Sequence, residues 1–248
     1  MLVGTVRAPP PPTTLPPDRG FPHRSETLLN VLARGQSWVV IVKPAGLRAV
    51  PGRAEDAGDS VQSRVPMVWP WAKSHHTPHR LDIETSGLMV IALNKNVFRA
   101  IARQFERRHV GKSYTAILDG EVSGESGAIE LPLTVDWPNR PRQKICHEEG
   151  RPCRTLWRVT RRSEGRTMVE FRPETGRTHQ LRVHAASPRD AGGLGCPIAG
   201  DTLYGNPDSA PRMLLHASKL GFWAPYTGEW LKFHAPPPFD LSPELRVW

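Results

Sequence analysis

The chain has 248 residues, which is enough for one substantial core or for one domain with a tail. Lysine and arginine number 33 against 24 acidic residues, and the formal net charge of +9 favours a polyanion such as RNA or DNA as the partner, although a generally basic protein has the same composition. No run approaches the roughly 18 apolar residues of a membrane helix, which excludes a membrane-spanning helical protein.

Cysteine usage indicates a reducing compartment. Cys146, Cys153 and Cys196 show no metal-ligand spacing, and their odd number leaves at least one thiol unpaired. The start of the chain lacks the compact apolar block of a secretory signal peptide. We therefore expect a cytoplasmic protein.

The first 24 residues differ in composition from the rest of the chain. They contain the proline runs at 9–12 and 16–17 and few apolar residues, so this segment cannot bury enough surface to fold. We expect a disordered tail over residues 1–24 and a single folded domain over residues 25–248.

Short aliphatic runs predict the first strands of the domain, and apolar residues at helical spacing predict its first helix. Residues 37–43 predict a strand, which is followed by a loop that holds Arg48 and Arg53. Residues 88–94 predict a second, buried strand. Residues 96–109 predict a helix whose arginines fall opposite its apolar side, at positions 99, 103, 107 and 108. A solvated face is the favoured interpretation of these arginines, ahead of contact with a phosphate backbone.

The second half of the chain predicts mainly strands, over residues 114–118, 167–172, 214–222 and 228–233. Residues 177–186 predict one short helix that is entered through Gly176. Strands outnumber helices and do not alternate with them regularly, so the fold class is α+β rather than a doubly wound sheet.

One aspartate is placed more for chemistry than for packing. Asp82 follows Arg80 and precedes a turn of small residues at the mouth of the predicted strand 88–94. Acids are rarely left in an interior without a partner. A structural salt bridge that holds the loop and a catalytic carboxylate are equally compatible with this spacing.

Two further segments supply complementary residue types. Lys112 and Tyr114 offer a cation and an aromatic ring with a hydroxyl group, and residues 176–184, Gly-Arg-Thr-His-Gln-Leu-Arg-Val-His, offer arginines and histidines beside a glycine turn. His179 and His184 are expected to be hydrogen-bonded core or helix residues rather than catalysts.

Together these segments resemble the RluA family of pseudouridine synthases. Residues 79–88 are similar to the aspartate motif of that family, Lys112 and Tyr114 to its tyrosine motif, residues 176–184 to its arginine motif, and residues 42–47 to its opening strand and turn. The resemblance runs from about residue 36 to residue 239. It implies a catalytic fold with a mixed, largely antiparallel central sheet, flanked by helices and loops around an active-site cleft.

A narrower resemblance joins residues 50–53, 60–61 and 136–144 to a dual-specificity subgroup of the family. It implies that specific uridines are isomerised in structured RNA loops, in large-subunit rRNA, in the tRNA anticodon stem-loop or in both. The long proline-rich tail and the stretch 187–195 depart from the family pattern.

The family resemblance assigns roles to particular residues. Asp82 becomes the essential carboxylate, Tyr114 lies against the uracil, and Arg177 is the candidate ion-pair partner of Asp82, with a purely structural pair as the alternative. Arg80 enters the space that the everted base leaves, or grips a phosphate; a plain surface arginine is the alternative. Contacts with RNA are expected from Lys112, Arg48, Arg53, Arg140, Arg142 and Lys144.

The resemblance implies no redox cofactor and no metal, and we expect a monomer. His75, His76 and His79 suggest a metal site with Asp82, but no second cluster completes a recognised spacing. Trp137 and the pair Trp69 and Trp71 are expected to pack rather than to stack on bases.

Two competing functions share these features. An RNA-binding protein on an inactive synthase scaffold would have the same charge, and a metal-dependent hydrolase would use the histidines. The intact set of Asp82, Tyr114 and Arg177 argues for an active isomerase.

Overall fold

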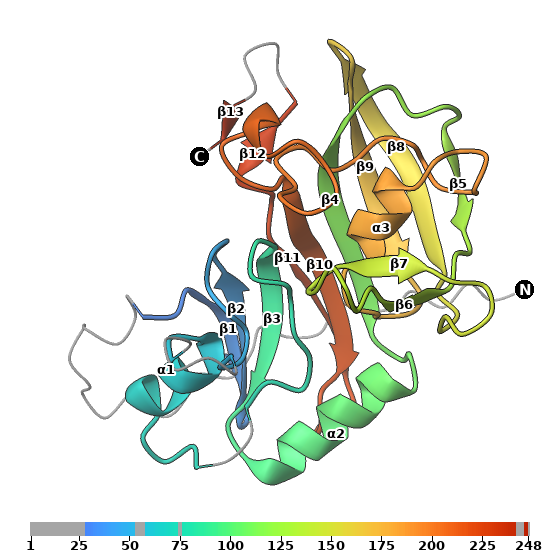
Figure 1. The fold of residues 1–248 in the computed structure, drawn as a ribbon. Coiled ribbons are helices and arrows are strands. Elements are labelled where there is room, and N and C mark those ends of the chain that lie inside the picture. The colour runs from blue at the N-terminus through green and yellow to red at the C-terminus, as the bar shows by residue number, and fades with distance from the viewer. Residues whose placement is uncertain (1–27, 53–57, 74–75, 242–245, 248) are drawn as a thin grey trace, which may run out of the picture.

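The computed structural model describes residues 28–52, 58–73, 76–241 and 246–247. The predicted tail over residues 1–24 lies outside this range. A nine-stranded sheet runs through the described part in the order β1-β2-β3-β10-β4-β9-β8-β5, with β11 paired to β10 (Figure 1). Its strands are β1 (Val31–Gly35), β2 (Trp38–Lys43), β3 (Ser86–Ala92), β4 (Gly111–Asp119), β5 (Ser126–Ile129), β8 (Thr155–Ser163), β9 (Arg166–Pro173), β10 (Leu215–Trp223) and β11 (Trp230–His234).

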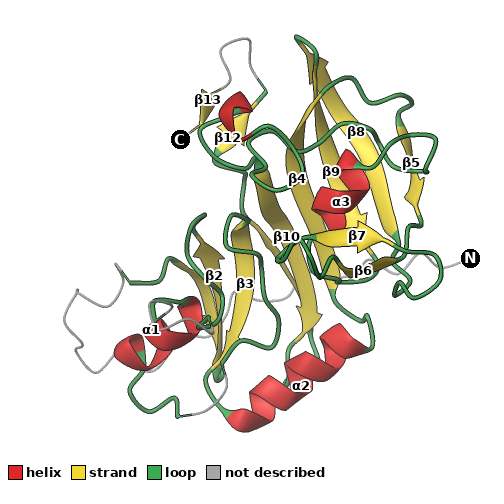
Figure 2. Ribbon diagram, viewed as in Figure 1, coloured by secondary structure: helices red, strands yellow, loops and turns green. Residues whose placement is uncertain are grey.

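Two small sheets and a few helices complete the described fold. β6 (Leu133–Val135) pairs with β7 (Gln143–Ile145), and β12 (Phe239–Asp240) pairs with β13 (Arg246–Val247). The helices are α1 (Val61–Val68), α2 (Lys95–Glu106), α3 (Gln180–Ala186) and the short 3-10 helix η1 (Pro207–Ser209). Strands dominate the molecule, as Figure 2 shows, and the predicted α+β class is confirmed. No helix in the described ranges is long and apolar enough to cross a membrane.

The sheet is mixed and mostly antiparallel, as expected. Its one parallel pair joins β3 to β10, where Ser86 lies opposite His216 and Gly87 opposite Ala217. This seam lies at the centre of the sheet, and α2 contacts both of its strands at one end (Figure 1). β3 and β10 therefore join the N-terminal and C-terminal halves of the sheet.

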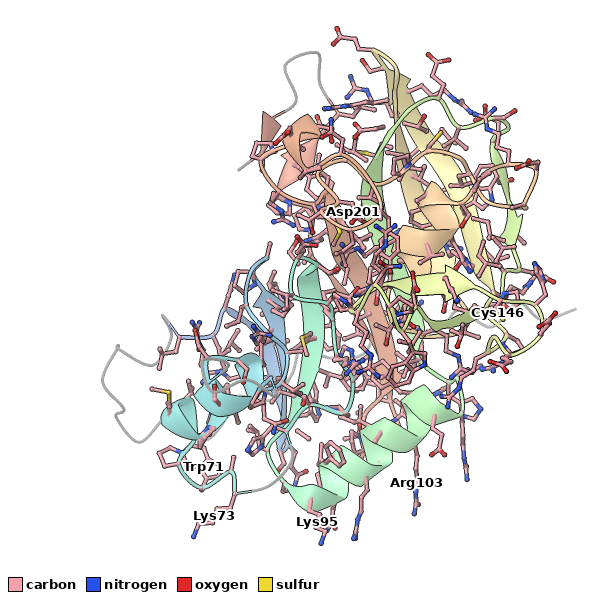
Figure 3. The ribbon with its side chains drawn as sticks, in the orientation of Figure 1. Trp71, Lys73, Lys95, Arg103, Cys146 and Asp201 are labelled. Carbon is pink, nitrogen blue, oxygen red and sulfur yellow. The ribbon has the colours of Figure 1, made fainter. Side chains whose placement is uncertain are left out.

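The predicted helix over residues 96–109 is confirmed as α2, with bounds a few residues shorter at its C-terminus. The side chain of Asn94 caps it by accepting the N–H group of Val97 at 2.9 Å. Val97 and Ile101 are buried against the sheet. The arginines of this helix are exposed, as predicted, and Figure 3 shows Arg103 pointing away from the protein.

The predicted helix over residues 177–186 begins three residues later, as α3. His179 adopts a left-handed backbone conformation with φ of 55°, so residues 177–179 form a turn and the helix starts at Gln180. The side chains from Gln180 to Ala185 are buried, and Leu181 and Ala185 of α3 belong to the same core cluster as Val169 and Phe171 of β9. The turn that precedes α3 thereby delivers Arg177 and His179 to one place.

Several elements were not predicted. Helix α1 contains Pro66 and a weak apolar face, and it begins at a capping box in which Ser60 and Ser63 bond each other's backbone N–H groups. In strand β8 the residues Arg158, Arg161 and Arg162 are all exposed and the register shifts after Val159, so its apolar pattern is broken by charge and by the bulge. Neither element has the periodic apolar signal on which a sequence prediction depends.

The seam between β3 and β10 depends on a glycine. Gly87 has a φ of +117°, and a Cβ atom at this position would lie 2.4 Å from the backbone oxygen of Ala217. Gly87→Ala should therefore lower the free energy of unfolding by about 2 kcal/mol or more, through both strain and collision. Gly58→Ala is the matched control, because no atom lies within 4 Å of a Cβ built there. Equal urea-unfolding curves for the two variants would contradict this account.

Candidate active site

Asp82 lies in the loop that leads into β3 and is partly exposed. It lines a cavity of about 90 Å³ together with Tyr114, Arg177, His179 and Arg182. The structure thus brings the three predicted catalytic residues, Asp82, Tyr114 and Arg177, to one cavity from three distant segments of the chain.

This central cavity forms part of a longer groove. It shares Arg80, Lys112 and Tyr114 with a hollow of about 530 Å³ that is bounded by α2. On its other side it shares Arg80, Asp82 and Arg182 with a hollow of about 580 Å³ whose rim includes Arg48 and Pro141. The carboxylate of Asp82 therefore faces space that a polynucleotide can enter.

A buried lysine holds the loop that carries Asp82. The ammonium group of Lys43 donates to the backbone oxygens of Pro44, Leu47 and Ile83 at 2.8, 2.7 and 3.0 Å. Burial lowers the pKa of Lys43 to about 7, and the negative charge of Asp82 opposes that shift. Lys43 was not among the predicted site residues, although its position before Pro44 in the opening motif is a usable signal. It links the turn after β2 to the aspartate loop.

Tyr114 projects from β4 between the two core clusters that meet at the seam. Burial raises the pKa of its phenol, and the negative charge of Asp82 raises it further. The phenol is therefore neutral at physiological pH, so it offers an aromatic face and an O–H group rather than a charge.

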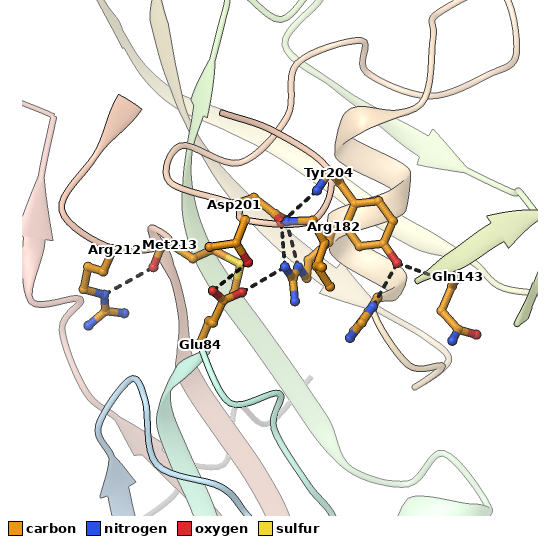
Figure 4. A network of polar contacts seen from close by, with 10 residues as sticks. Glu84, Gln143, Arg182, Asp201, Tyr204, Arg212 and Met213 are labelled. Carbon is orange, nitrogen blue, oxygen red and sulfur yellow. Dashed lines mark hydrogen bonds and ion pairs between the residues drawn. The ribbon is translucent and has the colours of Figure 1, made fainter. Parts of the chain in front are cut away.

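The arginine that anchors the site is Arg182, on α3, rather than Arg177. Its Nε and Nη2 atoms donate to the two carboxylate oxygens of Asp201 at 2.8 and 2.5 Å, and Nη2 also donates to Glu84 at 2.9 Å (Figure 4). Burial opposes the charge of Arg182, but the hydrogen bonds and charge of Asp201, with a contribution from Asp82, raise its pKa. Asp201 is fully buried, and Thr202 completes the network by donating to Glu84 at 2.8 Å.

Sequence reasoning missed Arg182 because its motif contains two arginines and the spacing does not distinguish them. Its acidic partner Glu84 lies in the aspartate motif, and pairing that carboxylate with a buried helix position would have pointed to Arg182. Arg177 is exposed, and no ion pair joins it to Asp82 among the described residues. The charge of Arg177 acts instead on Cys153. Burial raises the pKa of the Cys153 thiol above its ordinary value, and the positive charge of Arg177 offsets part of that rise. The expected ion pair between Asp82 and Arg177 is therefore not formed in this structure.

Two predicted RNA-binding cations line the groove close to Asp82. Arg80 is exposed and donates to the hydroxyl group of Thr178 at 3.1 Å, next to the turn before α3. The Lys112 ammonium donates to the backbone oxygen of Thr175 at 3.2 Å. Burial, together with the nearby charge of Arg108, lowers the pKa of Lys112 to about 8. Arg48 lies on the rim, whereas Arg53 lies outside the described residues.

The loop between β6 and β7 presents the remaining predicted cations. The guanidinium group of Arg140 lies 3.4 Å from the ring centroid of Trp137, and that of Arg142 lies 5.0 Å from the ring of Tyr204. Lys144 is exposed on β7. Trp137 was expected to pack rather than to stack on bases, and its side chain is 65% exposed, with Arg140 over the ring. Of the other pair, Trp69 is buried and Trp71 is exposed.

The histidines serve the scaffold. Nε2 of His79 accepts the N–H group of Val90 at 3.0 Å, and its ring stacks on Phe105. Burial lowers the pKa of His79 to about 3, so it stays neutral. His179 and His184 are hydrogen-bonded in the interior, as predicted. The described residues hold no group of three or more side chains placed to bind a metal ion, and His75 lies outside them.

Comparison with known proteins agrees with this geometry. A family model described as RNA pseudouridylate synthase matches residues 37–187. The dual-specificity RNA pseudouridine synthase RluA of Pasteurella multocida (strain Pm70) is 42% identical over 219 residues, which cover 87% of this chain and 96% of that protein. The protein of the same name from Escherichia coli (strain K12) is 43% identical over 218 residues, 86% of this chain and 95% of that protein. The solved structure of human RNA Pseudouridylate Synthase Domain Containing 1 aligns with a TM-score of 0.72 at 27% identity and covers 92% of both chains.

The chain therefore belongs to the RNA pseudouridylate synthase family. It is an isomerase that acts on RNA, and its fold is that of a pseudouridine synthase.

The buried Arg182 network can be tested by removing its cation. Arg182→Met should lower the free energy of unfolding by about 3–5 kcal/mol, because the fully buried carboxylate of Asp201 is left without its partner. The pKa of Asp201 is held below its ordinary value of 3.8, so this stabilisation is present above pH 3.8 and is lost as the pH falls through the folded pKa. Urea unfolding at neutral pH measures the change.

The control for this variant is Asp59→Asn, which breaks an ion pair with Arg64 in which the carboxylate is exposed. It should change the free energy of unfolding by no more than about 1 kcal/mol. A loss of that small size in Arg182→Met would show that the network does not hold the site together.

Proposed function

We propose that this enzyme converts specific uridines to pseudouridine in structured RNA loops, with Asp82 as its essential carboxylate. The observation that carries the proposal is the position of Asp82, which lines a small cavity with Tyr114 between two larger hollows rimmed by cations. A small cavity suits one everted base, and the hollows suit the nucleotides on either side of it. Splayed loop bases are the part of RNA that a protein reads most readily.

The reaction breaks the N1–C1′ glycosidic bond, turns the uracil and forms a C5–C1′ bond. C5 loses its proton to solvent or to a base, and N1 gains one, so the product is an isomer of uridine. The reaction involves no net oxidation or reduction. The Asp82 carboxylate acts as nucleophile on the sugar, as base, or as the negative charge that stabilises a cationic sugar. All three roles require the carboxylate at the sugar–base junction, and the groove leaves that position open.

The neighbours of Asp82 complete the site in this proposal. Tyr114 holds the uracil by stacking, which is worth about 1–3 kcal/mol per base, and its neutral O–H group is available for proton transfer. Arg80, at the junction of all three hollows, grips a phosphate or occupies the space of the everted base. We retain Arg177 as a catalytic residue that pairs with Asp82 only after RNA enters, since both line one cavity.

The choice of RNA follows the relatives named above. Both bacterial relatives are called dual-specificity enzymes, and their similarity extends over 86–87% of this chain. We therefore propose large-subunit rRNA, the tRNA anticodon stem-loop or both as substrates. We further propose that residues 25–248 act as one catalytic domain, as a monomer in the cytoplasm, without metal or cofactor; the free thiols of all three cysteines support a reducing compartment.

Replacing the carboxylate tests the catalytic proposal. Asp82→Asn should reduce pseudouridine formation in a target stem-loop by about 10²-fold or more, because the group that acts on the reacting bond is lost. RNA affinity and thermal unfolding should stay near those of the wild type. Asp208→Asn, which changes an exposed carboxylate on η1, is the matched control and should retain full activity. Turnover by Asp82→Asn close to the wild-type rate would refute the assignment.

Charge reversal on the β6–β7 loop tests the RNA-binding proposal. Arg140→Glu with Arg142→Glu should weaken binding of a target stem-loop by about tenfold or more and flatten its salt dependence, because each phosphate contact contributes about 0.7–0.9 to the slope of log K against log salt. Filter binding at several salt concentrations measures both quantities. Lys95→Glu with Arg103→Glu, on the exposed face of α2, changes the charge equally and should have little effect. Equal losses in the two double variants would exclude a specific role for the loop.

A further inference from the structure

The sheet has a second charged face behind the active site. Alternate residues of a strand point to opposite faces, so Ser113 and Thr115 point away from the face that carries Tyr114. The hydroxyl group of Ser113 donates to Glu170 at 2.7 Å, and Glu170 lies opposite Thr115 in the register of β4 and β9. Glu170 therefore belongs to the rear of the sheet.

Glu170 organises three cations from three strands. Its side chain is 6% exposed, and its oxygens accept from Lys219 at 2.7 Å, from Arg158 at 2.9 Å and from Arg172 at 3.2 Å. Burial opposes its ionisation, but the hydrogen bonds from Lys219, Ser113 and Arg158 lower the pKa of Glu170 to about 2. One fixed negative charge thus holds three positive ones in place, and two positive charges remain in excess.

These cations face solvent. The side chains of Lys219, Arg158 and Arg172 are 53%, 62% and 59% exposed, so each keeps donors free for an incoming group. An ion-pair cluster built only for stability would place fewer cations around one carboxylate, because surplus like charges repel each other. The arrangement is complementary to a polyanion.

An aromatic surface continues the same face. Lys219, Gly221 and Trp223 alternate along β10 and share one side of it. Trp223 lies opposite Trp230 of β11, with ring centroids 5.2 Å apart, and is 48% exposed. The ring of Trp230 lies over Gly221, where a Cβ atom would come within 2.7 Å of it. Lys232 is exposed on β11 beside this pair.

We propose that this rear face, formed by Arg158, Arg172, Lys219, Trp223 and Trp230, is a second RNA-binding surface. It binds a segment of substrate RNA outside the target loop, with phosphates at the cations and an unpaired base against Trp223. The proposal rests on the proposed function in so far as RNA is the substrate. Cations beside an exposed aromatic ring are the combination that single-stranded RNA requires, whereas an acidic peptide would need no stacking surface.

A triple variant removes the face without exposing Glu170. Arg158→Gln, Arg172→Gln and Trp223→Ala leave Lys219 and Ser113 bonded to the carboxylate. Two probes are compared, a short stem-loop with the target uridine and a large-subunit rRNA transcript that contains the same stem-loop. Binding to the transcript should weaken tenfold or more, and its salt slope should fall by about 1.4 for two single-strand phosphate contacts. Binding and turnover of the stem-loop should not change.

The control triple variant is Lys73→Gln, Lys95→Gln and Trp71→Ala, which removes two exposed cations and one exposed tryptophan that do not belong to the rear face (Figure 3). It should bind both probes like the wild type. The unfolding temperature of both triple variants is measured alongside binding. If that of the rear-face variant drops, the single changes Arg172→Gln and Trp223→Ala are tested in its place. Each single change should weaken transcript binding about threefold or more.

Two outcomes would overturn the proposal: transcript affinity that equals that of the control, or an equal loss on the stem-loop and the transcript. Failure of the wild-type enzyme to convert uridine in either probe would instead count against the proposed function, so the two failures are distinguishable.

Discussion

The buried ion pair between Arg182 and Asp201, extended to Glu84, is the interaction on which the site depends. A buried arginine is stable only with its charge matched and its donors satisfied, and each partner here comes from a different segment. The network ties α3 to the loop at Asp201 and to the aspartate loop, in which Glu84 lies two residues after Asp82. The pairing therefore fixes the loop that carries Asp82, on which the proposed chemistry depends.

A second constraint acts on Ile83, the residue next to Glu84. Lys43 donates its three protons to the backbone oxygens of Pro44, Leu47 and Ile83, and Gly87 lets β3 approach β10 closely at the seam. The aspartate loop is therefore held at two adjacent residues, at Ile83 by a lysine and at Glu84 by an arginine. Both contacts restrain the backbone that follows Asp82, and a fixed position is what a reacting carboxylate requires.

Much of this arrangement was predictable from local patterns. The buried strand after Asp82, the amphipathic helix and the α+β class followed from apolar periodicity, and the motifs placed Asp82 and Tyr114 together. The pairing of Arg182 instead of Arg177 was not predictable, because it depends on the left-handed turn at His179 that decides which arginine enters the interior. The exposure of Trp137 was also not predictable, because it lies on a loop whose own arginine covers the ring.

The central claim is that the Asp82 carboxylate isomerises particular uridines in cellular RNA. Mapping pseudouridine in total RNA from cells that lack this protein, and from the same cells supplied with wild-type or Asp82→Asn protein, tests it most directly. The account predicts that a small set of loop uridines in rRNA, tRNA or both loses the modification and regains it only with the wild type. An unchanged map, or full restoration by Asp82→Asn, would contradict it.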